Sequence, residues 1–537
     1  MNGYLCALLD CSRNGVMKLT ALKKFIDTLA SMGYNALQLY TEDTYEIKEE
    51  PLFGYMRGRY SQQELKEIDA YAKERGVELI PCIQVLGHLD QLFPWKRFQP
   101  IQDMYNVLLV GEEETYALID NMFATCAECF GSRKINICMD EVHVLGLGKY
   151  LDKHGYEKRS DILLKHLTRV CEIAKKYGFS PIMWSDMFFK LAFGAYHTDD
   201  EALPQDVLDK VPQNVSVAYW NYMCTDPSVF DAMLKKHKDF KRPVWFAGTA
   251  KKFSSFCSGN AVSIDSLSVS LPACKRAGVE NVLITLWGDY GDECSVAAVL
   301  PSLFYAAKLY HGEDDIEIIK RKFEEQFGEK WDDFMLCDML MPEDFPKKSK
   351  EHNGAKTMLY CDPFLGRYDS MVFGNGKERK AYAALAKKFK AAKERSSSYG
   401  YLFEFYESLC KVLSVKYDLG YLTRKYYQGG EREKLASLIG DYKKLIGLLE
   451  KFIELFRKTW NEENKPHGFD IHDIRLGGLL QRVKYCHAKL KSYLSGEIDV
   501  IEELEEKLVE DESDNKLNHV MENFGRWSHI ATVNRYE

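Results

Sequence analysis

Two adjacent carboxylates, Asp140 and Glu141, end an apolar run that begins at Lys134. Side chains alternate between the two faces of a β-strand, so both carboxylates can face one site only if the strand ends there and the backbone turns into a loop. Residues 144–148, with two glycines, supply that loop. Paired carboxylates at a strand end suit glycosidic-bond chemistry, in which one group donates a proton while the other stays ionised. Taken alone, such a pair more often caps the next element or lies in water, so the surrounding sequence decides.

The segments around this pair alternate between strand and helix patterns. Eight apolar runs with the character of strands are separated by amphipathic helical stretches, over roughly 310 residues. The alternation predicts an α/β fold, specifically a (β/α)8 TIM barrel. A doubly wound open sheet is the alternative, but no GxGxxG or Walker loop follows an early strand. The predicted strands are residues 4–9, 36–40, 78–85, 134–141, 181–184, 215–220, 244–247 and 282–287.

The composition changes beyond about residue 335. Only Pro466 occurs after Pro363, and long segments rich in Lys, Glu, Leu and Ala follow at 377–395, 431–456 and 478–494. These patterns predict helices. The sequence therefore predicts two domains, a catalytic barrel over residues 1–335 and an all-α C-terminal domain over residues 336–537.

The overall composition narrows the class of partner. The 537 residues include 72 basic and 80 acidic side chains, giving a net charge of -8 without long runs of one sign. This balance argues against nucleic-acid or anionic-membrane surfaces and favours a neutral substrate. No run approaches the roughly eighteen apolar residues of a membrane span, and the N-terminus lacks the basic region of a signal peptide. The 15 cysteines are scattered along the chain, with CxxC spacing only at Cys126 and Cys129, so we expect reduced thiols and a cytoplasmic location.

In TIM barrels, the active site is built at the carboxyl ends of the strands. Aromatic walls beside carboxylates and an arginine would suit a pyranose, whose apolar faces pack on indole rings while its hydroxyls bind charged groups. Surface pairing of Arg13 with Asp10 and a structural role for His88 are the alternatives for those two residues. Because no His, Asp or Cys cluster has ligand spacing, we expect neither metal nor cofactor. The strand-end candidates are Arg13, Glu42, Asp43, His88, Asp140, Glu141, Trp184, Asp186, Trp220, Asn221, Trp245, Trp287 and Asp289.

Several of these strand ends resemble motifs of the glycoside hydrolase family 20 β-N-acetylhexosaminidases. The likeness runs along the whole barrel, which begins at residue 4, so we expect the small α/β domain that many family members carry in front of it to be absent. The matching segments are Asp10-Cys11-Ser12-Arg13, the stretch from Tyr60 to Gly87-His88, Asn136-Ile137-Cys138-Met139-Asp140-Glu141, Met183-Trp184-Ser185-Asp186 and Leu286-Trp287-Gly288-Asp289.

The resemblance implies an exo-β-N-acetylhexosaminidase that removes terminal non-reducing β-GlcNAc or β-GalNAc with retention of configuration. Glu141 would protonate the glycosidic oxygen. Asp140 would orient the substrate's 2-acetamido group, whose carbonyl oxygen attacks C1 to give an oxazolinium ion. His88, held by Glu42 or Asp43, would act on Glu141.

The resemblance also implies how the terminal sugar is bound. Arg13 would clamp O3 and O4, and an indole box would surround the sugar ring and the acetamido methyl group; its members are Trp184, Trp220, Trp245 and Trp287. The tyrosine that bonds the attacking carbonyl is unassigned, with Tyr219 and Tyr222 as candidates. Asp289 stands where the family often has Glu, which leaves the O4 or O6 contact to Asp289, Asp292 or Glu293.

One alternative function remains on the same fold, a non-catalytic amino-sugar-binding or sensor protein. Retention of both carboxylates, Arg13 and His88 argues against it. The sequence leaves open the choice between GlcNAc and GalNAc, the linkage, the aglycone and the oligomeric state.

Overall fold

The structure is a computed structural model, and it describes residues 3–197, 202–340, 354–369, 372, 374–507 and 525–534. The chain divides into two compact units. The first comprises Met1–Lys251, Ala261–Trp287 and Ser302–Ile319, and the second comprises Lys252–Asn260, Gly288–Pro301 and Lys320–Glu537. The second unit thus begins earlier along the chain than residue 336 and takes in two short segments from the barrel half of the sequence.

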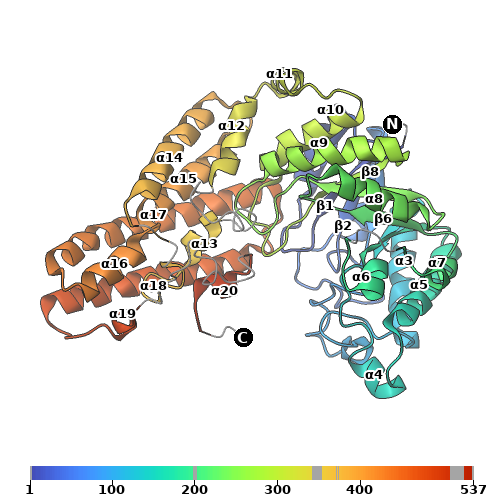
Figure 1. Ribbon diagram of the computed structural model, residues 1–537, viewed down its shortest axis with the longest axis horizontal. Coiled ribbons are helices and arrows are strands. Elements are labelled where there is room, and N and C mark those ends of the chain that lie inside the picture. Colours follow the sequence, from blue (N-terminus) through green and yellow to red (C-terminus); the bar gives the residue numbers. More distant parts are fainter. Residues whose placement is uncertain are drawn as a thin grey trace. The chain divides into compact units, whose positions relative to one another are not determined.

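Eight parallel strands form the centre of the first unit (Figure 1). They pair in sequence order, and Leu5 of the first strand pairs with Val282 of the last, which closes the barrel. The closed barrel confirms the predicted fold and rules out the open doubly wound sheet. The strands are β1 (Leu5–Asp10), β2 (Ala36–Tyr40), β3 (Glu78–Cys82), β4 (Lys134–Cys138), β5 (Ser180–Trp184), β6 (Ser216–Trp220), β7 (Val244–Thr249) and β8 (Asn281–Leu286).

The helices of the barrel half bury one apolar stripe each. In the first of them the inward residues are Leu22, Phe25, Ile26 and Leu29, at the spacing of one helix face. Ser61 and Glu64 form the predicted capping box, with each side chain accepting the other's backbone N–H. The helices are α1 (Leu19–Met32), α2 (Gln62–Glu74), α3 (Glu113–Cys129), α4 (Lys149–His154), α5 (Arg159–Lys176), α6 (Asp186–Phe193), α7 (Gln205–Lys210), α8 (Pro227–Lys238), α9 (Asn260–Ala277), α10 (Leu300–Tyr310) and α11 (Ile316–Phe327).

The secondary-structure elements described for the second unit are all helices, which confirms the all-α expectation (Figure 1). Its core contains a cluster of stacked rings in which Phe405 lies 5.6 Å from Phe452 and 5.2 Å from Phe456, measured between centroids. The remaining helices are α12 (Trp331–Met335), α13 (Gly354–Tyr360), α14 (Lys377–Arg395), α15 (Gly400–Lys416), α16 (Leu419–Gln428), α17 (Arg432–Glu463), α18 (Phe469–Ser495), α19 (Glu502–Glu505) and α20 (Trp527–Ala531).

A buried ionic cluster fixes the segment Gly288–Pro301 within this second unit. Glu293 accepts a hydrogen bond from Lys356 Nζ at 2.5 Å and lies 3.3 Å from Arg475 Nη1. Both cations also donate to the carbonyl of Tyr290. Because the Glu293 and Lys356 side chains are fully buried, the loss of either would leave an uncompensated charge inside the fold.

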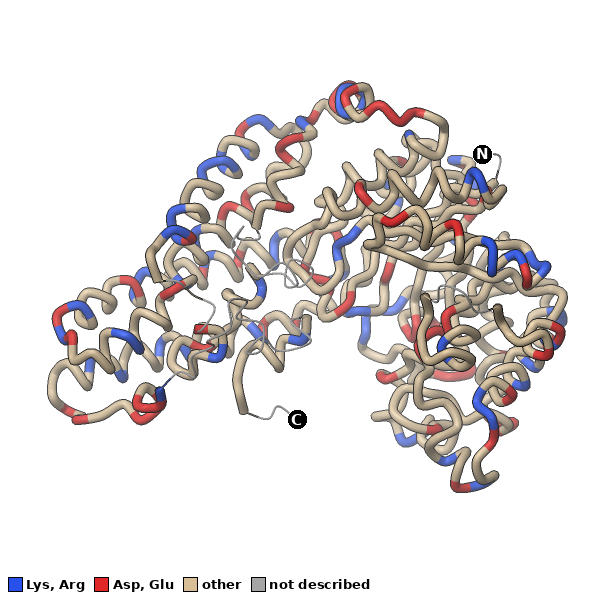
Figure 2. Tube along the Cα trace, viewed as in Figure 1, with Lys and Arg blue, Asp and Glu red and all other residues tan. Residues whose placement is uncertain are grey.

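Charged residues are interspersed along both units, as Figure 2 shows. Acidic and basic residues both occur in each unit, in agreement with the absence of long runs of one sign in the sequence. Across the part of the chain that the structure describes, every helix is too short or too polar to traverse a lipid bilayer.

Candidate active site

The backbone at the end of β4 brings the side chains of Asp140 and Glu141 to the same site, although adjacent side chains of a strand point to opposite faces. The pairing of β4 with β5 shifts register between Asn136 and Cys138. Cys138, Met139 and Glu141 then adopt positive φ angles of 56°, 67° and 52°, which residues other than glycine rarely do. These left-handed turns bring both carboxylates to one histidine: His88 Nε2 lies 3.3 Å from Asp140 Oδ2 and 3.8 Å from Glu141 Oε2.

His88 and Asp140 form an ion pair that sets the charge of each. Burial acts to lower the pKa of His88, but the Asp140 carboxylate outweighs it and raises that pKa to about 9. Burial likewise acts to raise the pKa of Asp140, but His88 and a hydrogen bond from Gln84 Nε2 at 2.8 Å leave that pKa below its ordinary value. At neutral pH, therefore, Asp140 is ionised and His88 is protonated.

Arg13 lies at the end of a hydrogen-bond chain that leads to Asp140. Its Nη2 is 3.3 Å from Glu42 Oε1 and its Nη1 is 3.0 Å from Asp10 Oδ2. The Tyr40 hydroxyl donates to Glu42 at 2.9 Å and accepts from Gln84 Nε2 at 3.1 Å. Burial raises the pKa of Glu42 to about 7, although the Arg13 charge opposes this. Arg13 thus pairs with Asp10, but the pair does not lie on the open surface. The Arg13 side chain is largely buried and also contacts Glu42.

The neighbouring carboxylate, Asp43, has a different partner. Arg57 donates to Asp43 Oδ1 from Nη2 at 3.0 Å and from Nε at 3.2 Å. The same guanidinium donates to the carbonyl of Ser12. Glu42 therefore belongs to the network that reaches Asp140, whereas Asp43 fixes the loop that follows β2.

Three of the predicted tryptophans join Tyr222 in one aromatic group, which we name the indole wall: Trp184, Trp220, Tyr222 and Trp287. The Trp287 ring lies 6.2 Å from the Trp184 ring, and its Nε1 donates to the Tyr222 hydroxyl at 3.0 Å. Tyr222 in turn stacks on Trp220 at 5.2 Å. The Arg13 guanidinium lies 5.7 Å from the centroid of Trp287, so the wall and the arginine border the same space.

Two predicted placements are wrong. Trp245 is the second residue of β7, which runs to Thr249, and its ring stacks on Tyr4 just before β1. It therefore lies at the amino end of the barrel, because the strand continues well past it. Tyr219 packs against the helix layer, 4.9 Å from His237 of α8, since strand alternation sends it away from the side on which Trp220 projects. Tyr222 is thus the candidate tyrosine beside the indoles.

The acidic candidates that follow β8 lie in the second unit. Asp292 is buried and paired with Lys252, and Glu293 is buried in the cluster with Lys356 and Arg475. Asp289 is half-buried, and its backbone carbonyl accepts from Ser254 N at 3.0 Å. The contact of Asp289 with O4 or O6 stays a prediction.

Asp186 and Lys190 complete the surroundings of Glu141. Asp186 is fully buried and its Oδ2 accepts the backbone N–H of Glu141 at 3.1 Å. Lys190 Nζ lies 3.5 Å from Asp186 Oδ2 and 3.8 Å from Glu141 Oε1. Burial and the Asp140 charge raise the pKa of Asp186 to about 7. Sequence reasoning missed Lys190, although its position four residues after Asp186 on one helix is the spacing of an ion pair.

His88, Asp140 and Glu141 are also a possible cation-binding group, since one ligand atom of each lies within 4.8 Å of the others. Two observations favour proton chemistry there. A histidine with a pKa of about 9 carries a proton on the nitrogen that a metal would need. Lys190 already places one positive charge against Glu141.

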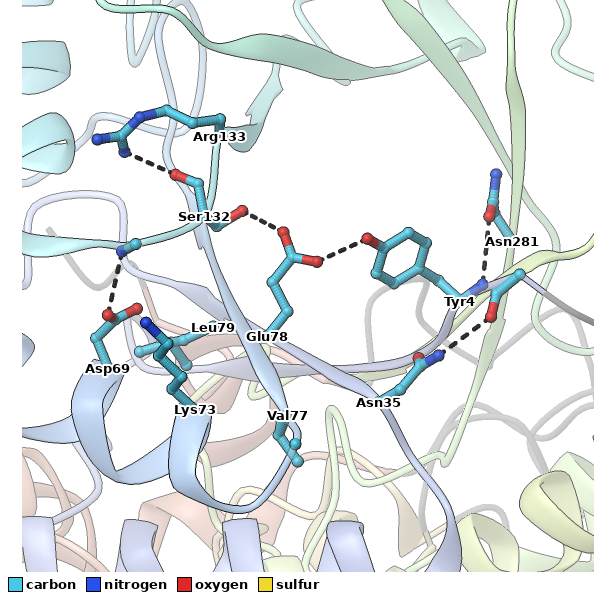
Figure 3. A pocket seen from close by; sticks show the side chains of 13 residues that line it. Tyr4, Asn35, Asp69, Lys73, Val77, Glu78, Leu79, Ser132, Arg133 and Asn281 are labelled. Carbon is cyan, nitrogen blue, oxygen red and sulfur yellow. Dashed lines mark hydrogen bonds between the residues drawn. The ribbon is translucent and has the colours of Figure 1, made fainter.

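A cavity of about 670 Å³ opens at the other end of the barrel, lined by residues at the amino ends of the strands (Figure 3). Its central carboxylate, Glu78, accepts hydrogen bonds from the Tyr4 hydroxyl and from Ser132 Oγ, both at 2.7 Å. In TIM barrels this end serves stability rather than catalysis. We therefore place the candidate active site at the carboxyl ends of the strands.

Comparisons with known proteins confirm the predicted family. A family model described as the glycosyl hydrolase family 20 catalytic domain matches residues 3–232, and one described as the glycoside hydrolase 20C C-terminal domain matches residues 332–522. The chain is 26% identical to Hexosaminidase D of Bos taurus over 222 residues, covering 38% of this chain and 59% of the relative. It is 25% identical to Hexosaminidase D of Homo sapiens over 216 residues, covering 38% and 42%.

Among solved structures, the exo β-N-acetylglucosaminidase of family 20 from Vibrio harveyi, in complex with N-acetylglucosamine, matches with a TM-score of 0.46 and 16% identity. The match covers 60% of this chain and 56% of that chain. The chain spans about half the length of the curated relatives it matches. The catalytic-domain model spans β1 to β6 and the 20C model spans most of the helical region, so the chain belongs to glycoside hydrolase family 20.

Proposed function

We propose that this protein is an exo-β-N-acetylhexosaminidase that removes terminal non-reducing β-GlcNAc or β-GalNAc by a retaining, substrate-assisted mechanism. The observation that carries the proposal is the convergence of an ionised Asp140 and an adjacent Glu141 on a protonated His88. The arginine and the indole wall beside them suit a pyranose.

Asp140 acts on the substrate rather than on the enzyme. Its carboxylate accepts the N–H of the 2-acetamido group and turns the acetamido oxygen toward C1. That oxygen forms a bond to C1 while the bond from C1 to the glycosidic oxygen breaks, which gives an oxazolinium ion and needs no enzyme nucleophile. The positive charge that develops on the acetamido nitrogen is stabilised by Asp140, which the His88 pair keeps ionised.

Glu141 supplies and recovers the proton. It protonates the glycosidic oxygen as the bond to C1 breaks, and its carboxylate then removes a proton from the water that opens the oxazolinium ion. The side chain is 45% exposed, as expected for a group at the mouth of the pocket, where the leaving group departs. Retention follows because C1 is attacked twice, once by the acetamido oxygen and once by water.

Arg13 and the indole wall hold the terminal sugar. A guanidinium has five N–H donors, so Arg13 can bind O3 and O4 of the sugar while it keeps its contacts with Asp10 and Glu42. Tyr222, anchored by Trp287, is the proposed donor to the acetamido oxygen.

Hydrolysis of p-nitrophenyl β-GlcNAc, β-GalNAc and β-glucoside, with and without a thiazoline mimic of the oxazolinium ion, tests the proposal. We expect activity only on the two acetamido sugars, with inhibition by the thiazoline and loss of activity on natural oligosaccharides in Glu141→Gln. Cleavage of the glucoside at a similar rate would refute substrate assistance. If none were cleaved while GlcNAc still raised the melting temperature, the non-catalytic sugar-binding alternative would replace the enzyme.

A cytoplasmic location is the remaining part of the proposal. It rests on the fifteen cysteines, all of which are free. Free, mostly buried thiols are typical of a reducing compartment. Labelling of the native protein with a thiol reagent in cells would test it.

A further inference from the structure

Lys190 is a cation placed directly against the proposed acid. Its Nζ lies 3.8 Å from Glu141 Oε1 and 3.5 Å from Asp186 Oδ2, and its side chain is 20% exposed. The proposed mechanism assigns no role to this lysine.

Both acidic partners of Lys190 lose charge in the reacting state. Glu141 must be neutral, because it holds the proton that the glycosidic oxygen receives. Asp186, with a pKa of about 7, is partly protonated at neutral pH and mostly protonated at mildly acidic pH. When substrate is ready to react, the positive charge of Lys190 therefore has little compensation from the protein.

The position of Lys190 relative to the two oxygens of Glu141 shows which part of a substrate it faces. Glu141 Oε2 lies nearest His88, next to Asp140, whereas Oε1 lies nearest Lys190. His88 and Asp140 thus lie beside one oxygen of Glu141, and Lys190 lies beside the other. A glycosidic oxygen hydrogen-bonded to Glu141, at about 2.7 Å, brings the first atoms of the aglycone within reach of Lys190 Nζ.

Two further basic residues lie near Lys190. His143 lies two residues after Glu141 in the sequence. Its pKa is lowered mainly by burial and secondly by the charge of Lys190. Arg159 Nη1 donates to the carbonyl of His143 at 2.6 Å. Lys190 Nζ also lies 5.8 Å from the centroid of the Trp220 ring. Lys190 thus lies beside both Glu141 and one ring of the indole wall.

We propose that Lys190 is a specificity-determining residue that binds a carboxylate on the first aglycone sugar, so that the preferred substrates carry the terminal N-acetylhexosamine on a uronic acid. The substrate's carboxylate replaces the negative charge that Glu141 and Asp186 lose. The inference rests on the proposed function and names the substrate class for it.

Two disaccharides that differ in one group provide the test. N-acetylglucosamine β-linked to glucuronic acid and the same sugar linked identically to glucose differ only at C6 of the aglycone. For the wild-type protein at low ionic strength we expect kcat/KM about tenfold higher on the acidic disaccharide, with the ratio falling as salt is added. In Lys190→Met the ratio should fall to about one, and in Lys190→Arg it should largely return.

The ratio of the two substrates separates specificity from a general loss of rate. A Lys190 variant that slows both disaccharides equally, with the preference kept, would show that the lysine only stabilises Glu141 and would overturn the inference. Lys176→Met serves as the matched control, because Lys176 is an exposed lysine of α5 paired with Asp120; it should keep the wild-type ratio.

The outcome for the proposed function is read separately. Equal kcat/KM on both disaccharides in an active wild-type enzyme overturns the inference and leaves the hexosaminidase proposal standing. Failure to cleave either disaccharide or p-nitrophenyl β-GlcNAc overturns both.

Discussion

The ion pair between His88 and Asp140 predicts a histidine that titrates far above the ordinary range. With the carboxylate 3.3 Å from Nε2, the pKa of His88 stands at about 9 against an ordinary value of 6.5. Asp140→Asn removes the carboxylate charge that raises the pKa of His88. Burial and the nearby Arg13 charge still act to lower that pKa. We therefore expect the pKa of His88 to fall from about 9 to below 6.5 in this variant.

The size of the effect follows from the two values. The difference between about 9 and 6.5 corresponds to about 3 kcal/mol, at about 1.4 kcal/mol for each factor of ten. Because the folded state holds this proton more tightly than the unfolded state, the stabilisation is full below about pH 6.5 and is lost as the pH rises through about 9. The lowered pKa of Asp140 arises from the same ion pair with His88, so it adds no separate contribution to the free energy of unfolding.

Proton–carbon NMR of histidine labelled at Cε1 measures this directly. The chain has 13 histidines, and the His88 signal is the one that disappears in His88→Gln. A titration from about pH 5 to about pH 10 brackets both values. A wild-type His88 that titrates near its ordinary value, or one whose titration is the same in Asp140→Asn, would refute the ion pair as the source of the charge.

Three other predictions concern the site and the helical unit. Asp140→Asn should lower kcat on p-nitrophenyl β-GlcNAc by about a hundredfold or more, since orientation and charge stabilisation are lost even with a good leaving group; an unimpaired variant would exclude the acetamido role. Tyr222→Phe should reduce kcat about tenfold or more, whereas Tyr219→Phe, in the helix layer, should not; equal effects would contradict this assignment. Glu293→Gln should destabilise the helical unit by about 3 kcal/mol, because Lys356 is left buried without its partner; urea unfolding followed by circular dichroism would measure it, and an unchanged midpoint would argue against the buried pair.

The barrel could be predicted because parallel strands buried on both faces are apolar runs of recognisable length. β1 to β8 all fall where such runs occur in the sequence. It was harder to predict whether a tryptophan lies at the amino end or the carboxyl end of its strand. Trp245 begins β7 rather than ending it, and an apolar run gives no sign of which end an indole occupies.

The geometry of the carboxylates could not be predicted either. Cys138 and Met139 are residue types that seldom adopt a left-handed backbone, so nothing in the sequence indicated that two successive residues there would turn. Lys190 was missed because a polar residue on an amphipathic helix usually faces solvent. Its contacts arise from the packing of α6 beside the strand end, a tertiary feature.

The left-handed turn at Cys138 and Met139 has a consequence for protein engineering. Each non-glycine residue held in this region costs about 1 kcal/mol or more, but the Met139 side chain is fully buried. Its removal in Met139→Gly would cost about 2 to 5 kcal/mol, so this variant should melt at a lower temperature. The same change would widen the range of positions open to Asp140 and Glu141. The burial of Met139 thus offsets the strain of this turn, and a library selected by heat resistance would keep a large apolar residue at this position.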